Sequence, residues 1–189
     1  KPFETILPGR DDAMLDAVEV FEDFLVYGER IQGQRQLRVV PNDGSAPYVI
    51  DFGESVYTAF SGQNPEFKTN NIRVVYSSMK TPKTVIDFNM RTREKTIRKM
   101  DEVQGGFDTT NYTTKRLWAT GRDGTKIPIS LMSRGEPTTD GSTPLYLYGY
   151  GSYGYAMDPW FMPSWISLVD RGITVAIAHV RGGEEMGRS

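Results

Sequence analysis

Residues 146–154 read Tyr-Leu-Tyr-Gly-Tyr-Gly-Ser-Tyr-Gly, and residues 175–183 read Val-Ala-Ile-Ala-His-Val-Arg-Gly-Gly. In each stretch an apolar strand runs directly into a glycine turn, and the two turns are about thirty residues apart. Parallel α/β sheets place their functional groups in turns of this kind, at the carboxyl ends of the strands. The two stretches therefore predict a pair of strands with a functional site at one edge of their sheet.

The segment between these stretches predicts a helix. Within residues 161–171 the apolar side chains of Trp165, Leu168 and Val169 follow helical spacing, and Gly172 is well placed to end that helix. A strand, a helix and a strand in this order form a parallel, right-handed unit. Upstream, residues 116–120 and 127–132 predict a hairpin around the turn 122–124, with Pro128 near an edge or a bulge. The second half of the chain therefore reads as α/β.

The first half reads as antiparallel β. Candidate strands at 18–27, 37–40, 48–52, 72–78, 84–90 and 95–98 are separated by Asn, Asp, Gly and Pro turns. This meander order is typical of a sandwich, barrel or propeller, and two strand groups on either side of the polar loop 61–71 suggest two propeller blades. Composition changes at Gly105-Gly106. We therefore expect one domain over residues 1–110 and a second over residues 111–189.

Composition narrows the classes of function. The 189 residues carry a net charge of −2, with no basic tract that would indicate nucleic acid and no polybasic stretch that would indicate a membrane. The longest apolar run, 173–180, is far shorter than the roughly 20 residues that span a bilayer. Cysteine is absent, which excludes disulfides and thiolate metal sites and favours a reducing compartment. We expect a cytoplasmic location, no cofactor, and neither nucleic-acid nor membrane partners.

The glycine turn imitates two nucleotide-binding motifs. Gly149-x-Gly151-x-x-Gly154 after a strand matches the dinucleotide pattern, and Asp170 lies where a ribose contact would come. That pattern needs a helix that begins at the glycines, but prolines interrupt the segment at 159 and 163. A protein-kinase loop fails for another reason, because Ala178 stands where the phosphate-binding lysine would be. Both interpretations are therefore weak.

An α/β hydrolase is the third interpretation. In that fold the loop after the third strand supplies part of the oxyanion hole. A tyrosine hydroxyl is a competent donor to a developing negative charge, and Tyr150 lies between two glycines that let the backbone approach a substrate. Tyr150 could equally be a packing tyrosine in a β-rich protein. On these residues alone, both roles stay open.

At these motifs the sequence resembles the prolyl oligopeptidase family of serine peptidases, and within it the oligopeptidase B type. The resemblance lies in residues 147–154, in Ser-Leu-Val-Asp-Arg-Gly at 167–172, and in Ala-His-Val-Arg-Gly-Gly at 178–183 with Met-Gly-Arg at 186–188. Tyr-Ser-Ser-Met-Lys-Thr-Pro at 76–82 also resembles the last propeller blades of the family. The motifs are specific in combination, and the resemblance extends over nearly the whole chain and is dense from Leu145 onward.

The resemblance implies a seven-bladed β-propeller joined to an α/β-hydrolase domain. It implies a Ser-Asp-His triad that cleaves short peptides after Arg or Lys. Tyr150 matches the oxyanion tyrosine of the family, and Asp158 resembles an acidic residue that favours a basic side chain in the second subsite. A second acid two positions later is replaced here by Trp160, and a third glycine after Gly183 is replaced by Glu184. The preference of the second subsite is therefore open.

The chain lacks the G-x-S-x-G elbow that would carry the nucleophile, and its only histidine, His179, precedes any place for it. We therefore expect an internal fragment, inactive alone, made of the last propeller blades and the first strands of the hydrolase domain. Two alternatives remain, a prolyl-specific peptidase and a non-catalytic propeller that binds a protein.

Several residues have ordinary structural interpretations. We expect His179 to be structural, and Arg181-Gly-Gly183 to be either a tight turn or part of the site floor. We expect Glu184 and Glu185 to be a solvated pair. The aromatic residues Trp160, Phe161 and Trp165 are expected in a core or a domain interface.

Overall fold

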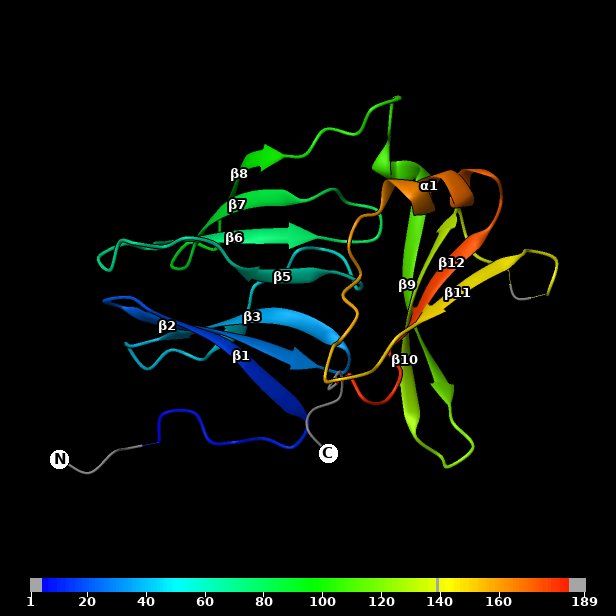
Figure 1. The fold of residues 1–189 in the computed structure, drawn as a ribbon. Helices are drawn as coiled ribbons and strands as arrows, with labels where there is room; N and C mark the ends of the chain where they lie inside the picture. The colour runs from blue at the N-terminus through cyan, green and yellow to red at the C-terminus, as the bar shows by residue number, and fades with distance from the viewer. Residues whose placement is uncertain (1–4, 139, 184–189) are drawn as a thin grey trace.

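The computed structural model describes residues 5–138 and 140–183, which form three open four-stranded sheets and a single α-helix (Figure 1). The first sheet contains β1 (Ala13–Val20), β2 (Phe24–Ile31), β3 (Gln34–Pro41) and β4 (Tyr48–Val49). The second contains β5 (Thr58–Ser61), β6 (Asn71–Ser77), β7 (Thr84–Asn89) and β8 (Lys95–Met100). The third contains β9 (Tyr112–Thr120), β10 (Lys126–Arg134), β11 (Leu145–Gly149) and β12 (Thr174–Ala178), and it carries helix α1 (Pro163–Asp170).

The first two sheets are antiparallel meanders whose strand order equals their sequence order. They stack as two layers in Figure 1 and enclose one apolar core, to which both contribute alternate residues of their strands. Val26 and Val39 from the first sheet and Ile72 and Val74 from the second are fully buried there. This arrangement is that of two adjacent propeller blades, as the sequence predicted.

Two details of the first half differ from the sequence prediction. The predicted strand 18–27 is divided between β1 and β2, because Phe21 and Phe24 both turn into the core and the Phe21 N–H donates to the Phe24 carbonyl at 2.8 Å. The predicted boundary at loop 61–71 is also wrong, because that loop joins β5 to β6 inside the second sheet. The two blades meet instead between β4 and β5.

The third sheet has the order β11-β12-β10-β9, with β11 and β12 parallel and the other pairs antiparallel. The predicted strand–helix–strand unit is confirmed, and Gly172 ends the helix region with φ +83°. The predicted hairpin is also confirmed, with Gly124 at φ +83° in its turn. Pro128 is not on an edge strand, because β10 pairs on both sides. It is tolerated because the pairing with β12 begins only at Ile129.

The two halves share side chains in a second core. Val56 and Met79 come from the first half, and they pack with Tyr112, Met132 and Trp165 from the second. The connection between the halves ends in a short 3₁₀ turn, Thr109–Asn111, which the Asp108 side chain caps by accepting from the Thr110 N–H at 2.9 Å. The blades and the third sheet are therefore held side by side by packing as well as by the chain.

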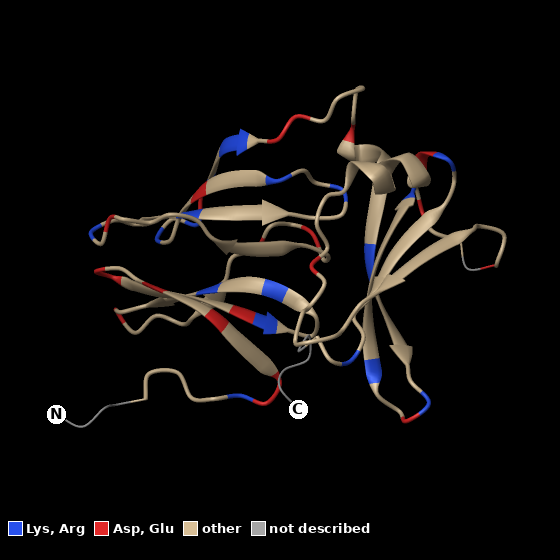
Figure 2. Ribbon diagram, in the orientation of Figure 1, with Lys and Arg blue, Asp and Glu red and all other residues tan. Residues whose placement is uncertain are grey.

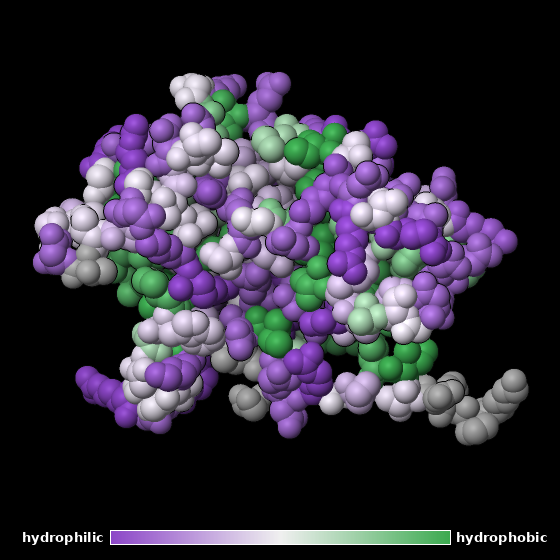
Figure 3. Space-filling model, turned by 180° about the vertical axis from the view of Figure 1, so that it is seen from behind, coloured by the Kyte–Doolittle hydropathy of each residue, from purple (hydrophilic) through white to green (hydrophobic). Residues whose placement is uncertain are grey.

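The surface of the molecule mixes charge and apolar area. Figure 2 shows acidic and basic residues interspersed over the first two sheets, whereas the strands of the third sheet carry basic residues only. Apolar side chains are also exposed, among them Leu145 and Leu147 on β11 and Val18 and Val20 on β1. Figure 3 shows green apolar surface over the third sheet and over the first sheet. Within residues 5–138 and 140–183, no helix is both long and apolar enough to cross a membrane.

Candidate active site

The two glycine turns of the sequence motifs meet at the carboxyl ends of β11 and β12. Gly149 and Ala178 form the last pair of the parallel ladder. Beyond it, a Cβ on Gly151 would lie 2.6 Å from the carbonyl oxygen of Arg181, and a Cβ on Gly182 would lie 2.0 Å from that of Gly151. The Gly154 N–H donates to the Gly182 carbonyl at 3.0 Å. The glycines are therefore required because two backbone turns pack directly on each other.

Tyr150 follows β11 immediately and lies between these glycines. Strand alternation places it on the same face as Tyr146 and Tyr148, whose rings pack against Trp165 of α1. Tyr150 itself is 40% exposed and makes an edge contact with Tyr155, with ring centroids 6.0 Å apart. The phenol is therefore available at the carboxyl edge of the sheet rather than buried in the core.

Asp158 lies in the segment between β11 and α1, and it faces the first sheet. Its Oδ1 accepts a hydrogen bond from Arg30 Nη1 at 2.7 Å. Both side chains are about nine-tenths buried, with exposed fractions of 10% and 9%. This ion pair joins β2 to the second half of the chain across 128 residues of sequence. The sequence alone did not identify Arg30, because nothing in the local pattern of β2 marks its distant partner.

His179 is structural, as expected. It is 2% exposed, and its Nε2 lies 2.7 Å from Ser130 Oγ, which is completely buried. Burial, and after it the positive charges of the nearby Arg116 and Arg30, lower the pKa of His179 to about 3. The pair resembles a catalytic Ser-His dyad in composition. No substrate can reach it, because both groups are sealed inside the sheet.

The turn between β2 and β3 seals this histidine from one side. A Cβ on Gly33 would lie 3.3 Å from the His179 ring and 3.3 Å from Pro128. Next to it, Gln34 Oε1 accepts from Arg116 Nη2 at 3.0 Å. Arg116 Nη1 and His179 Nδ1 are buried and have no partner in the described residues. The interface between the first and third sheets is thus polar and rich in positive charge.

The remaining predicted site residues take structural positions. The ring of Trp160 makes an edge contact with Phe60, and that of Phe161 with Phe107. Trp165 is a buried residue of α1. Arg181 forms an exposed ion pair with Asp123 of the β9–β10 turn, which lowers the pKa of that carboxyl to about 2. Glu184, Glu185 and the motif at 186–188 lie outside the described residues.

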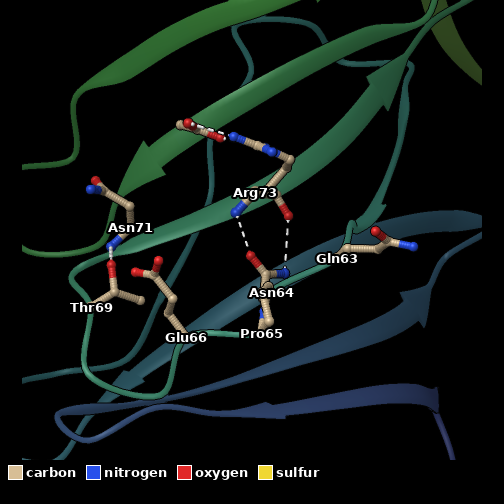
Figure 4. A pocket seen from close by; sticks show the side chains of 8 residues that line it. Gln63, Asn64, Pro65, Glu66, Thr69, Asn71 and Arg73 are labelled. Carbon is tan, nitrogen blue, oxygen red and sulfur yellow. Dashed lines mark hydrogen bonds and ion pairs between the residues drawn. The ribbon is translucent and has the colours of Figure 1, made fainter.

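A polar cavity of about 300 Å³ lies at the far end of the second sheet, beside the β5–β6 loop (Figure 4). Asn64 on its wall accepts from the Arg73 N–H at 2.7 Å and donates to the Arg73 carbonyl at 3.2 Å. The Arg73 side chain is bound to Asp87 at 2.8 Å. These groups hold the loop against β6, and Figure 1 shows that the loop points away from the third sheet and its glycine turns.

Comparison with known proteins identifies relatives of the whole chain. Residues 1–101 match the family model described as prolyl oligopeptidase, N-terminal β-propeller domain. Dipeptidyl aminopeptidase BI of Pseudoxanthomonas mexicana is 44% identical over 95% of this chain, and Protease 2 of Moraxella lacunata is 37% identical over 94%. Oligopeptidase B from Trypanosoma brucei, solved with covalently bound antipain, superposes on 96% of this chain with a TM-score of 0.82 and 37% identity.

The chain is much shorter than these relatives. It covers 25% and 26% of the two curated proteins and 27% of the solved chain. The similarity extends on both sides of the connection near residue 110, since each comparison spans more than nine-tenths of this chain. The two sheets of the first half therefore correspond to part of a larger propeller.

Proposed function

Because the chain belongs to the prolyl oligopeptidase family of serine peptidases, we propose that its full-length parent is a serine endopeptidase of the oligopeptidase B type. It would cleave short peptides after Arg or Lys through an acyl-enzyme. Residues 1–110 would be the last propeller blades, and residues 111–189 would begin the α/β-hydrolase catalytic domain. The triad would lie outside these 189 residues, so the fragment alone would be inactive. We propose a cytoplasmic location for this parent, with which the absence of cysteine from these residues is consistent.

The third sheet supports the proposed domain. Its antiparallel hairpin is followed by a parallel strand pair that a helix connects, which suits the start of an α/β-hydrolase sheet. β11 is an edge strand in the described residues, and Leu145 and Leu147 expose more than half of their surface. An exposed apolar edge strand has unpaired backbone groups that favour pairing with a further strand. A continuing sheet in the parent protein would supply one.

The observation that carries the proposal is the position of Tyr150. Its exposed phenol stands at the carboxyl edge of a parallel strand pair, beside two interlocked glycine turns. An oxyanion hole needs a fixed donor aimed at the place where negative charge develops. The turns fix the backbone on both sides of Tyr150, so the hydroxyl would be held in place before the reaction begins.

Cleavage after Arg or Lys is supported by sequence similarity. The T. brucei oligopeptidase B shares 37% of its residues with this chain over the aligned region. Asp158 would border the second subsite, and its ion pair with Arg30 would affect which substrate side chains that subsite prefers. Short peptides are the proposed substrates.

The test is Tyr150→Phe in the full-length parent, assayed with a fluorogenic Arg-amide peptide. Loss of one oxyanion donor lowers kcat by roughly 10²–10³-fold. Tyr153→Phe is the matched control, because Tyr153 is fully exposed and should leave kcat unchanged. An unchanged kcat for Tyr150→Phe would refute its catalytic role. The absence of any Arg-amide hydrolysis by the unmodified parent would refute the proposed function itself.

A further inference from the structure

The ion pair between Arg30 and Asp158 joins two groups that are far apart in sequence and almost inaccessible to water. Arg30 Nη1 lies 2.7 Å from Asp158 Oδ1, and each side chain exposes a tenth or less of its surface. Figure 2 shows charges of both signs at the end of β2 that approaches the third sheet. A buried charge is stable only when it is paired and hydrogen-bonded. Asp158 therefore already has a guanidinium partner before any substrate binds.

The surroundings of this pair are positively charged. Arg116 is also largely buried, and burial lowers its pKa to about 10. Its hydrogen-bond partner in the described residues is the neutral Gln34. Both Arg30 and Arg116 lie close enough to His179 to lower the pKa of that ring. Among the described residues no carboxylate pairs with Arg116, so its positive charge is uncompensated and disfavours a further cation nearby.

We propose that Arg30 is a specificity-determining residue, which occupies Asp158 as an internal guanidinium and so prevents a basic substrate side chain from using it. This inference rests on the proposed function, since it concerns the second subsite of that enzyme. A substrate Arg or Lys at this position must displace Arg30 from its carboxylate. The gain from the new ion pair is then offset by the loss of the old one. The second subsite in this chain accepts neutral and basic side chains about equally.

Removal of Arg30 changes this balance in a defined way. Arg30→Gln leaves Asp158 without its guanidinium, so a substrate guanidinium becomes the best available partner. A charge-assisted hydrogen bond of this kind is worth about tenfold or more in binding. A purely structural role of the pair would lower stability but would leave substrate preference unchanged.

The experiment compares kcat/KM for two fluorogenic peptide amides, Arg-Arg and Gly-Arg, with the full-length parent. We expect the unmodified enzyme to give a ratio within about threefold of one, and Arg30→Gln to raise it about tenfold in favour of Arg-Arg. Arg30→Lys, which keeps the positive charge, should stay close to the unmodified enzyme. Arg91→Gln is the matched control, because Arg91 pairs with Asp23 on an exposed turn of the first sheet.

A second variant tests the same inference through the carboxylate itself. In Arg30→Gln/Asp158→Asn the tenfold gain of Arg-Arg preference should disappear, because that gain depends on the carboxylate that Arg30 leaves unpaired. A gain that persists in the double variant, or an unchanged ratio in Arg30→Gln, overturns the assignment of Arg30 while Gly-Arg hydrolysis still supports the peptidase. Failure of the unmodified parent to cleave either amide overturns both.

Discussion

The buried pair of His179 and Ser130 predicts an acid sensitivity that can be assigned to one residue. His179 has a pKa of about 3 in the folded protein against 6.5 for a free side chain. The causes are burial first, and then the positive charges of Arg116 and Arg30. The folded state therefore holds a neutral imidazole between pH 6.5 and pH 3, where the unfolded chain binds a proton.

The sign and size of the effect follow from linkage. A lowered histidine pKa leaves stability intact above pH 6.5 and removes it as the pH falls toward 3. Each pH unit in this window costs about 1.4 kcal/mol. Acidification from about pH 7.5 to about pH 5 should therefore cost about 2 kcal/mol through His179 alone. Other groups add their own contributions, so only the part that disappears with His179 is diagnostic.

The assay is amide hydrogen exchange of β10 and β12 in the full-length parent, for the unmodified protein and for His179→Gln. The unmodified protein should lose about 2 kcal/mol of local opening free energy over this pH range beyond any loss in the variant. The backbone amides of Ser130 and Ile177 are suitable probes, because these residues are paired across β10 and β12 and Ser130 contacts His179. Equal pH dependence in the two proteins would show that His179 already carries a proton in the fold, and would refute the reasoning.

Three further predictions concern packing and the glycine turns of the full-length parent. Gly182→Ala should lower the free energy of unfolding by about 1–3 kcal/mol in denaturant and should also lower kcat, because its Cβ would collide with Gly151. Gly135→Ala is the control and should leave kcat unchanged, because Gly135 has φ +64° but open space around it. Equal kcat values for the two variants would exclude the steric argument. Trp165→Ala should cost about 3–5 kcal/mol, the range for a buried tryptophan, and a cost below about 1 kcal/mol in the same assay would contradict its place in the second core. Arg181→Met should leave kcat/KM for Gly-Arg amide unchanged, because Arg181 is paired with Asp123 at the surface; a tenfold loss would instead place it in the site floor.

Much of the fold follows from local signals that the sequence displays openly. The Asp123-Gly124 turn and the glycine at 172 each need a positive φ, and both were predicted in the correct elements. The helix was predicted from apolar spacing, and its boundaries changed by only a few residues. The two glycine turns could be predicted because each apolar strand is followed directly by several closely spaced glycines. Their mutual contact then follows from the parallel pairing of β11 and β12.

The errors share a physical cause, which is that strand pairing depends on distant partners. Polar composition made loop 61–71 look like a boundary between blades, although Asn64 binds both backbone groups of Arg73 and holds the loop within one sheet. Pro128 indicated an edge or a bulge, yet β10 is central. The proline is accommodated because the pairing with β12 begins only at Ile129. Composition indicates how polar a segment is, but it does not indicate which neighbouring segment forms hydrogen bonds with its backbone N–H and C=O groups.

The same limit explains why sequence motifs gave only half of the candidate site. Tyr150 could be located because its role depends on adjacent glycines, which are local. The partner of Asp158 could not be located, because Arg30 comes from a strand that is distant in the sequence. A carboxylate read from a motif suggests a site for cations. With Arg30 bound to it, the same carboxylate becomes a closed internal pair, and we propose that the blade facing Asp158, rather than the motif that contains it, decides the specificity of this subsite.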